Sequence, residues 1–320
     1  MLEGVDRMAK TKKSTKKILI GLLFLSCFAM WGETGLQQKR PEVPYVPTPE
    51  DVVAEMLKMA NVGEDDVIYD LGCGDGRIVI TAAKELGCRG VGIDIDPTRI
   101  QESRINASNA GVSDRVKFFQ MDLFEADISE ATVVTLYLLS KVNLRLRPKL
   151  FQELRPGTRV ISHDFSMGEW QPERSSVIEE KVDYVPFQDT RFIDDYWNKH
   201  TIYFWVIPAN VAGVWTWTIP TLSDNVPYRL EIDQNFQMLK GKAFHGSVSL
   251  PLDIKNGMIN GDRLELVLEK KDRRSTEKIH FEGIVKNHDI VGFVRIEGNP
   301  DFEEKWQAKR DASTRKPIEK

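Results

Sequence analysis

The stretch "VIYDLGCGDGRIVI", residues 67–80, decides the fold. An apolar run that contains one acid, Asp70, leads into glycines at every second position, Gly72, Gly74 and Gly76, and an apolar-periodic segment follows. This order predicts a buried strand, a tight turn and a helix. Because glycine allows a positive φ and a close approach to the backbone, we expect the turn to cradle a ligand.

Two phosphate-binding loops do not match this turn. A P-loop requires Lys-Ser or Lys-Thr after its last glycine, and neither follows Gly76. A dinucleotide fingerprint counted from Gly72 requires its third glycine where Arg77 stands. The pattern is D-x-G-x-G-x-G instead. Its leading acid suits a cationic amine, and its narrow spacing lets the backbone pass close beneath a small uncharged linkage.

Strand and helix patterns alternate around the loop. The first helix is expected after Thr48 as N-cap, with Pro49 at its first position. Strands separated by helical patterns of 10–15 residues predict βαβ units and a parallel sheet. The strands are expected at 66–71, 90–95, 115–123, 132–139, 158–165, 175–185 and 201–208, and the later helices at 76–87, 97–111 and 145–157, the last interrupted or begun at Pro148.

Residues 209–310 predict an all-β domain. Polar and apolar residues alternate in "YRLEID" and "RLELVLE", and Asn256-Gly257, Asn260-Gly261 and Asn287-His288 are turn signals. A meander, a sandwich or a small barrel fits. The G-x-W at Gly213 resembles that of lipocalin-like barrels, which leaves open a lipid-binding barrel or a domain that docks a partner. Residues 311–320 are expected to be a disordered tail.

Residues 1–32 are predicted to be a signal peptide or a membrane anchor, followed by a linker at 33–44. The apolar run from Ile18 to about Trp31 is shorter than the roughly 20 residues that span a bilayer untilted. Basic residues precede it, which favours translocation of the rest of the chain. An exported or membrane-anchored protein of the cell envelope is therefore expected. The basic residues are Arg7, Lys10, Lys12, Lys13, Lys16 and Lys17.

The composition is that of an ordinary globular protein. With 320 residues the chain is long enough for two domains, and its net charge of -4 gives no reason to expect a nucleic-acid partner. Cys27, Cys73 and Cys88 form no C-x-x-C, so the cysteines imply neither a zinc site nor a disulfide framework.

Two more acids stand at the ends of the next expected strands. Asp94, in "GIDIDP", lies eighteen residues past Gly76, near the spacing of about 20 residues for a ribose-binding acid, and Asp122, in "FQMDLFE", ends the third strand. Ligands bind at the carboxyl ends of parallel strands. Together with the glycine loop, these acids resemble class I S-adenosylmethionine-dependent methyltransferases over about 45–208.

That resemblance implies an α/β fold, a Rossmann-like seven-stranded methyltransferase sheet, with S-adenosyl-L-methionine as cofactor. It implies that Asp70 and the backbone of the three loop glycines hold the methionine end, and that Asp94 takes both ribose hydroxyls. Asp122 would accept from the adenine amino group beside Leu123, and Ile95 would pack on the adenine.

A narrower resemblance is carried by "VPYVPTPEDVVAEML", "VVTLYLLSKVNLRLRPKL" and "PGTRVISHDFSMGEWQPE". These segments look like the protein-lysine methyltransferase family that includes the enzyme acting on the ATP synthase c-subunit. The resemblance implies N-methylation of a protein lysine, with Tyr45 and Thr48 near the methionine end of the cofactor, closing the site. The export-like segment and the β domain have no counterpart there. The alternative is an exported binding protein built on a methyltransferase scaffold.

Methyl transfer from a sulfonium needs alignment and a neutral nucleophile, but neither a metal nor a covalent intermediate. The N/DPPY tetrapeptide is missing and "TLYLLS" replaces it, which argues against adenine methylation. Tyr137, His163 and Asp164, at the ends of the fourth and fifth strands, are candidate catalytic residues, with core packing or structural hydrogen bonds as the alternatives. The segment Trp170-Gln171-Pro172 is a candidate for shaping the substrate channel, with a structural role as the alternative. A domain on the cytosolic face would suit the supply of the cofactor.

Overall fold

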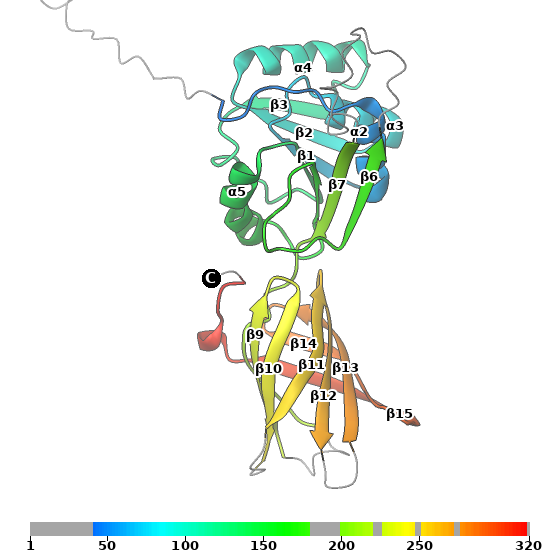
Figure 1. Ribbon diagram of the computed structural model, residues 1–320, viewed down its shortest axis with the longest axis vertical. Coiled ribbons are helices and arrows are strands. Elements are labelled where there is room, and N and C mark those ends of the chain that lie inside the picture. Colours follow the sequence, from blue (N-terminus) through cyan, green and yellow to red (C-terminus); the bar gives the residue numbers. More distant parts are fainter. Residues whose placement is uncertain (1–40, 180–198, 220–225, 247–250, 272–275, 319–320) are drawn as a thin grey trace, which may run out of the picture. The chain divides into compact units, whose positions relative to one another are not determined.

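The computed structural model describes residues 41–179, 199–219, 226–246, 251–271 and 276–318. These residues form a seven-stranded sheet with helices and a closed eight-stranded barrel (Figure 1). The predicted signal peptide or anchor lies outside the described residues, as does most of the predicted linker. The predicted domain boundary at residue 208 stays a prediction.

The seven-stranded sheet has the order β3-β2-β1-β4-β5-β7-β6. Strands β1 to β5 run parallel, whereas β7 runs antiparallel to both of its neighbours. This confirms the predicted Rossmann-like methyltransferase sheet. Its strands are β1 Val67–Leu71, β2 Arg89–Asp94, β3 Val116–Gln120, β4 Val133–Leu136, β5 Arg159–His163, β6 Arg174–Glu179 and β7 Lys199–Val206.

Helices cover both faces of this sheet. Because side chains alternate along a strand, Ile68 of β1 packs in one core with α2, α3 and α4, whereas Tyr69 and Leu71 pack in a second core with α5. Burial on both faces explains why the central strands are almost continuously apolar. The helices are α2 Glu50–Met59, α3 Arg77–Leu86, α4 Pro97–Asn109 and α5 Ser140–Glu153.

Two helix starts differ from the sequence prediction. Helix α2 has Pro49 as its N-cap, and Thr48 makes no cap hydrogen bond because its side chain lies in the core beside His163. Helix α5 begins at Ser140 and continues through Pro148, although proline removes one internal hydrogen bond. Buried residues on both sides of this proline, Leu146 and Leu150, hold the helix against the sheet.

The C-terminal strands close into a barrel in which each strand pairs with the next and β15 pairs with β8. This decides between the meander, the sandwich and the barrel that the sequence left open. Alternate residues of β9 and β12 fill its interior, as their patterns predicted. The strands are β8 Gly213–Trp217, β9 Tyr228–Asn235, β10 Met238–His245, β11 Leu252–Asn260, β12 Arg263–Lys271, β13 Thr276–Lys286, β14 Asp289–Ile296 and β15 Asn299–Arg310.

Arg310 joins the last strand of the barrel to the first. Its guanidinium lies 5.0 Å from the centre of the Trp215 ring and donates to the carbonyls of Asn210 at 2.7 Å and Asn287 at 2.9 Å. Burial lowers the pKa of Arg310 to about 10, with a further effect of Arg315, so the side chain stays charged at neutral pH. Arg310 and Trp215 are also register partners in the pairing of β15 with β8 that closes the barrel.

The segment after β15 is ordered to residue 318, which corrects the predicted disordered tail at 311–320 over that range. The Asp311 side chain caps the short helix η2 Ala312–Thr314 by accepting from the Ser313 amide. The Val214 amide donates to the Thr314 hydroxyl at 2.8 Å, and Ile318 is buried. The hydrogen bond to Val214 holds residues 311–318 against β8.

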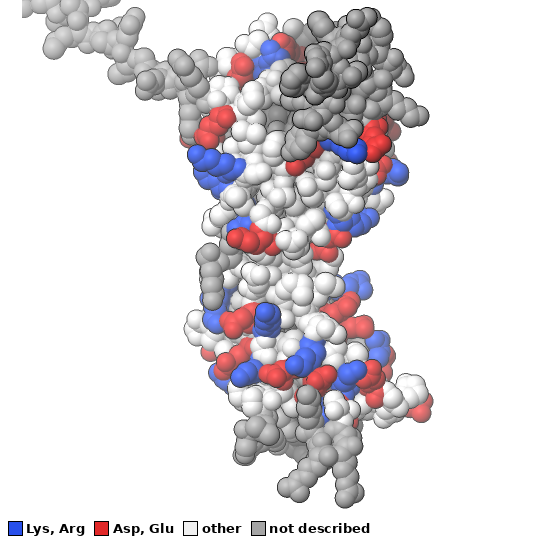
Figure 2. Space-filling model, in the orientation of Figure 1, with Lys and Arg blue, Asp and Glu red and all other residues white. Residues whose placement is uncertain are grey.

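On the face shown in Figure 2, Lys and Arg are interspersed with Asp and Glu. Several charges pair between strands of the barrel, as Arg295 does with Glu303 at 2.7 Å. Such exposed ion pairs contribute little to stability, and they place positive and negative charges side by side on the surface.

Candidate functional site

The glycine loop adopts backbone angles that favour glycine. Gly72, Gly74 and Gly76 have φ of +86°, +52° and +79°, and Gly76 is the N-cap of α3. A Cβ built on Gly74 would lie only 2.4 Å from Cε2 of Tyr45. The Tyr45 ring therefore packs directly on the loop, whereas its predicted place near the methionine end of the cofactor stays a prediction. The positive φ and the packed ring together leave room only for glycine at position 74.

Asp70 is a buried acid in β1, next to the glycine loop. It is 3% exposed, and the Thr135 hydroxyl donates to its Oδ1 at 2.8 Å. Burial raises the pKa of Asp70 to about 7, and the nearby charges of Asp94 and Asp75 add to this. A cation bound here would stabilise the ionised carboxylate. This is the environment expected of an acid that receives the amino group of a ligand.

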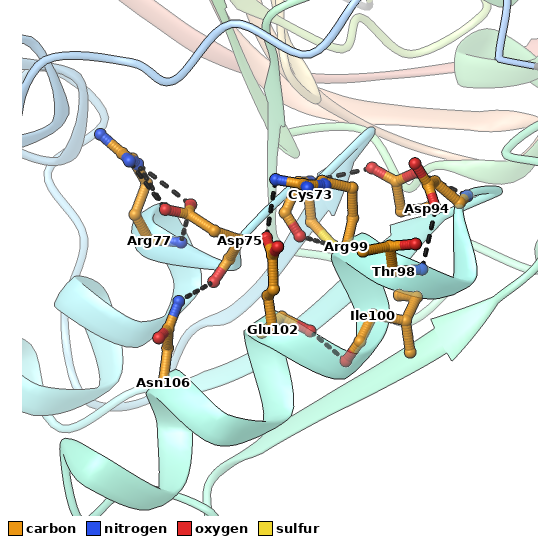
Figure 3. Close-up of polar contacts among 12 residues, drawn as sticks. Cys73, Asp75, Arg77, Asp94, Thr98, Arg99, Ile100, Glu102 and Asn106 are labelled. Carbon is orange, nitrogen blue, oxygen red and sulfur yellow. Dashed lines mark hydrogen bonds and ion pairs between the residues drawn. The ribbon is translucent and has the colours of Figure 1, made fainter.

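Asp94, at the end of β2, holds the loop in place. Its Oδ2 accepts from the Gly74 amide and its Oδ1 from the Asp96 amide, both at 2.9 Å. A carboxylate has about four lone-pair positions, so both oxygens keep capacity for a ligand. Asp94 thus links the end of β2 to the turn that follows β1, and Figure 3 shows Asp94 beside Cys73 and Thr98.

The end of β3 joins the same edge. The Met121 amide donates to the Asp94 carbonyl at 3.0 Å, and Asp122 Oδ1 accepts from the Phe124 amide at 3.0 Å. Ile95 and Leu123 are half-buried in the turns after β2 and β3. The structure therefore places these predicted cofactor residues in the turns that follow the strands. Their individual contacts to a cofactor stay predictions.

The ion pair between Asp75 and Arg77, which the sequence did not predict, supports the loop. Arg77 donates to Asp75 from Nε at 3.0 Å and from Nη2 at 2.7 Å, and its Nη1 donates to the Thr48 carbonyl at 2.8 Å. The side-chain amide of Asn106 donates to the Asp75 carbonyl (Figure 3). Burial would raise the pKa of Asp75, but the hydrogen bonds and charge of Arg77 outweigh it and lower the pKa.

Tyr45 lies between this ion pair and α4. The guanidinium of Arg99 is 4.4 Å from the centre of its ring, within cation–π distance. Burial, and then the charge of Asp75, raise the pKa of the Tyr45 hydroxyl. The ring is thus a fixed wall over Gly74, although 44% of the residue remains exposed.

The ends of β4 and β5 carry the three predicted catalytic candidates, and the structure brings them together. The ring of Tyr137 stacks on that of His163 at 3.8 Å between centroids, and His163 Nε2 lies 3.2 Å from Asp164 Oδ2. Thr48, predicted beside the cofactor, has its hydroxyl 3.4 Å from His163 Nδ1. Their catalytic roles stay predictions.

His200, which the sequence did not single out, joins this group from β7. Its Nδ1 lies 2.9 Å from His163 Nε2. Burial, with the charge of His200 adding, lowers the pKa of His163 to about 4 against the opposing charge of Asp164. His163 is therefore neutral at pH 7. No spacing in the sequence could have revealed His200, because only the antiparallel pairing of β5 with β7 brings it here.

Trp170 faces the core and not a channel, which corrects the hypothesis about the segment Trp170-Gln171-Pro172 for its first residue. It is fully buried, its ring packs on Phe151 and Trp205, and its carbonyl accepts from the Trp205 indole at 2.9 Å. The residue is part of the core on the α5 side of the sheet.

The residues fit S-adenosyl-L-methionine by three observations. The loop packs its backbone against an aromatic ring with no room for a Cβ at Gly74. Asp70 is a buried carboxyl that a cationic amine would stabilise. Asp94 follows β2 on the same edge with spare acceptor capacity.

Comparisons with known proteins point the same way. Residues 70–174 match the family model described as the ANTKMT methyltransferase domain. A protein-lysine N-methyltransferase of Saccharolobus islandicus is 48% identical over 168 residues, which are 52% of this chain and 95% of that protein. The human lysine N-methyltransferase named for the ATP synthase c-subunit is 34% identical over 143 residues, 45% of this chain and 60% of that protein.

Among solved structures, an RNA methyltransferase from Salinibacter ruber in complex with S-adenosyl-L-homocysteine is 54% identical. The match covers 52% of this chain and 96% of that one, with a TM-score of 0.44. These relatives match about half of this chain.

Proposed function

This chain belongs to the protein-lysine N-methyltransferase family, and from that membership we propose that it transfers a methyl group from S-adenosyl-L-methionine to the side-chain amine of a lysine in a protein. The observation that carries the proposal is the loop Gly72–Gly76 between the Tyr45 ring and the Asp94 carboxylate. Among the residues that the structure describes, no specific feature supports the alternative of an exported binding protein.

The residues of the site divide the work of holding the cofactor. Asp70 would receive the amino group of its methionine end, and the loop backbone would lie beneath that end. Asp94 would take the ribose hydroxyls, and Asp122 with Ile95 and Leu123 would hold the adenine. Once bound, S-adenosyl-L-methionine supplies a methyl group activated by its sulfonium. Tyr45 and the ion pair of Asp75 with Arg77 keep the loop in one conformation, which lowers the entropy lost on binding.

The acceptor would enter beside the ends of β4 and β5, where Tyr137 and Asp164 are partly exposed. A lysine amine must be neutral to attack, and desolvation among the aromatic rings of this region lowers its pKa. The protein thus contributes alignment of the acceptor amine with the methyl group.

The N-terminal segment supports a further part of the proposal, that the protein is anchored in or exported through a membrane. Its basic residues and the apolar run Ile18–Trp31 support this location. Among the described residues, none of the helices is long and apolar enough to cross a membrane. A cytosol-facing catalytic domain would have direct access to its cofactor. Reporter fusions after residue 208 and at the C-terminus test the location.

Methylation can be tested with the full-length protein and isotope-labelled S-adenosyl-L-methionine. Membrane and soluble fractions of the source cells, lacking the gene, serve as substrates in parallel with total RNA, and mass spectrometry locates the label. We expect label on lysine side chains, and none with the Asp94→Ala variant. Label in RNA alone would overturn the proposed acceptor, and failure of the wild-type protein to bind the cofactor in calorimetry would overturn the enzyme function.

A further inference from the structure

Three side chains with metal-binding atoms converge at the junction of β5 and β7. They are His163, the last residue of β5, Asp164, which follows it, and His200, the second residue of β7. His163 Nε2 is 2.9 Å from His200 Nδ1 and 3.2 Å from Asp164 Oδ2, and the last two atoms are 3.5 Å apart. The three atoms thus form a nearly even triangle.

The backbone around Asp164 holds this carboxylate toward the two imidazoles. Its amide donates to the Thr201 carbonyl at 2.7 Å, and the Thr201 amide donates back to Asp164 Oδ1 at 2.8 Å. Asp164 also has a φ of +58°, a left-handed conformation that costs about 1 kcal/mol or more outside glycine, although Asp and Asn tolerate it best. Oδ1 is engaged in this way, and Oδ2 faces the histidines.

His163 is oriented in a similar manner. Its ring stacks on Tyr137, and its Nδ1 lies 3.4 Å from the Thr48 hydroxyl, which leaves Nε2 directed at His200 and Asp164. In metal sites, a ligating histidine commonly bonds a neighbouring oxygen through its other ring nitrogen, and that contact fixes the ring. Thr48 is placed to serve as this outer partner.

We propose that His163 Nε2, His200 Nδ1 and Asp164 Oδ2 bind a divalent transition-metal ion such as Zn²⁺. Ligands about 2.0–2.2 Å from one ion lie roughly 3–3.5 Å from each other, which is close to the observed spacing. Two imidazoles and one carboxylate are a donor set that Zn²⁺ and Fe²⁺ accept, with positions left over for water. The Asp164 side chain, 27% exposed, gives the ion an opening to solvent, whereas the His163 side chain is fully buried.

A bound ion has two consequences for the domain. It links β5 to β7, the strand pair on the antiparallel side of the sheet, so it stabilises the folded state. It also occupies the lone pairs of His163 and Asp164, which makes these residues ligands and excludes them as proton acceptors while the ion is bound. This site uses no residue of the glycine loop, and its test does not depend on the proposed methyl transfer.

The experiment is zinc titration of the full-length, untagged protein after treatment with a chelator. Calorimetry and elemental analysis are expected to give one Zn²⁺ per chain, with a higher Tm in the presence of zinc. Loss of an outer partner alone weakens metal sites about 10–100-fold, so loss of a ligand in His200→Ala is expected to weaken binding at least about 100-fold. Asp164→Asn, which suits the left-handed backbone, is expected to weaken it at least tenfold.

His280→Ala is the matched control, because His280 is a half-buried histidine on β13 in the barrel. It is expected to bind zinc as the wild type does. Binding of S-adenosyl-L-homocysteine and the circular dichroism spectrum establish that each variant is folded. Zinc binding of equal strength in wild type and His200→Ala, or no stoichiometric zinc in the folded wild type, would overturn the site and leave a hydrogen-bonded histidine pair.

Discussion

The ring of Tyr45 occupies the space that a side chain at residue 74 would need, since a Cβ on Gly74 would lie 2.4 Å from Cε2 of Tyr45. The two residues are 29 positions apart in the chain, and their contact fixes the loop against the segment before α2. Arg99 covers the ring from α4 at 4.4 Å. These contacts hold the loop in the observed shape.

Gly74→Ala is expected to weaken cofactor binding at least about tenfold, because the new Cβ meets the Tyr45 ring at a positive φ. Gly111→Ala is the control, since Gly111 also has a positive φ, +71°, but nothing within 4 Å of the added Cβ. It should lose about 1 kcal/mol of stability and keep its affinity for the cofactor. Calorimetry and thermal unfolding measure both effects.

The double variant Gly74→Ala/Tyr45→Ala separates the clash from the strain. If the ring is the obstacle, the added Cβ no longer clashes once the ring is removed. The double variant should then lose less cofactor affinity than the sum of the losses of the two single variants. Strictly additive losses would show that the contact between these residues does not shape the loop.

Asp70 is expected to couple stability and cofactor binding to pH. Its pKa of about 7 in the folded protein is above its ordinary value of 3.8, so the folded state binds the extra proton between these values. The contribution of Asp70 to stability is therefore present at low pH and is lost as the pH rises toward and through about 7, by at most about 1.4 kcal/mol per unit. The difference between wild type and Asp70→Asn, measured by denaturant unfolding from pH 5 to 8, isolates it.

Cofactor affinity should change in the opposite direction. A cationic amine favours ionised Asp70, so binding is expected to strengthen as the pH rises from 5.5 to 7.5 and to release a proton. Calorimetry in buffers of different ionisation enthalpy detects that proton. A wild type whose affinity and proton release match those of Asp70→Asn across this range would show that Asp70 does not receive the amine.

The elements around the glycine loop could be predicted from the sequence because their signals are local. We could recognise the strand pattern, the alternating glycines and the acids Asp94 and Asp122 from neighbouring residues alone. Parallel strands then bring their carboxyl ends to one edge of the sheet. The turn signal at Asn260-Gly261 was likewise confirmed, with φ of +58° at Gly261.

The sequence did not distinguish a turn from a β-bulge, because the same residue types occur in both. Asn256-Gly257 was predicted as a turn but lies within β11, where the register shifts between Lys255 and Met258. Asn256 has a φ of +50°, which a bulge needs as much as a turn does. His200 and Arg310 were missed for another reason: their partners are distant in sequence, and only the strand pairing shows which residues meet.

Arg310→Ala is expected to destabilise the barrel by about 1–3 kcal/mol, because it leaves the carbonyls of Asn210 and Asn287 without the donor that this buried arginine supplies and uncovers Trp215. Arg295→Ala is the control. It removes an arginine of the same barrel whose pairs with Glu282 and Glu303 are exposed, and it should leave the unfolding midpoint nearly unchanged. Denaturant unfolding followed by tryptophan fluorescence compares them. Equal effects of the two variants would contradict a special role of Arg310.

Tyr137 is expected to act as a wall of the acceptor site and not as a base. Burial, and then the charge of Asp164, raise the pKa of its hydroxyl, so it stays protonated at neutral pH. Tyr137→Phe keeps the ring that stacks on His163 and should retain kcat within a few-fold. Tyr137→Ala removes that ring and should lower kcat at least tenfold, because the acceptor amine loses its alignment. The Kd of the cofactor should change less than twofold in both variants.

Two outcomes would contradict this role of Tyr137. If Tyr137→Phe loses as much activity as Tyr137→Ala, the hydroxyl takes part in the reaction. If the Kd of the cofactor rises in Tyr137→Ala, Tyr137 belongs to the cofactor side of the site.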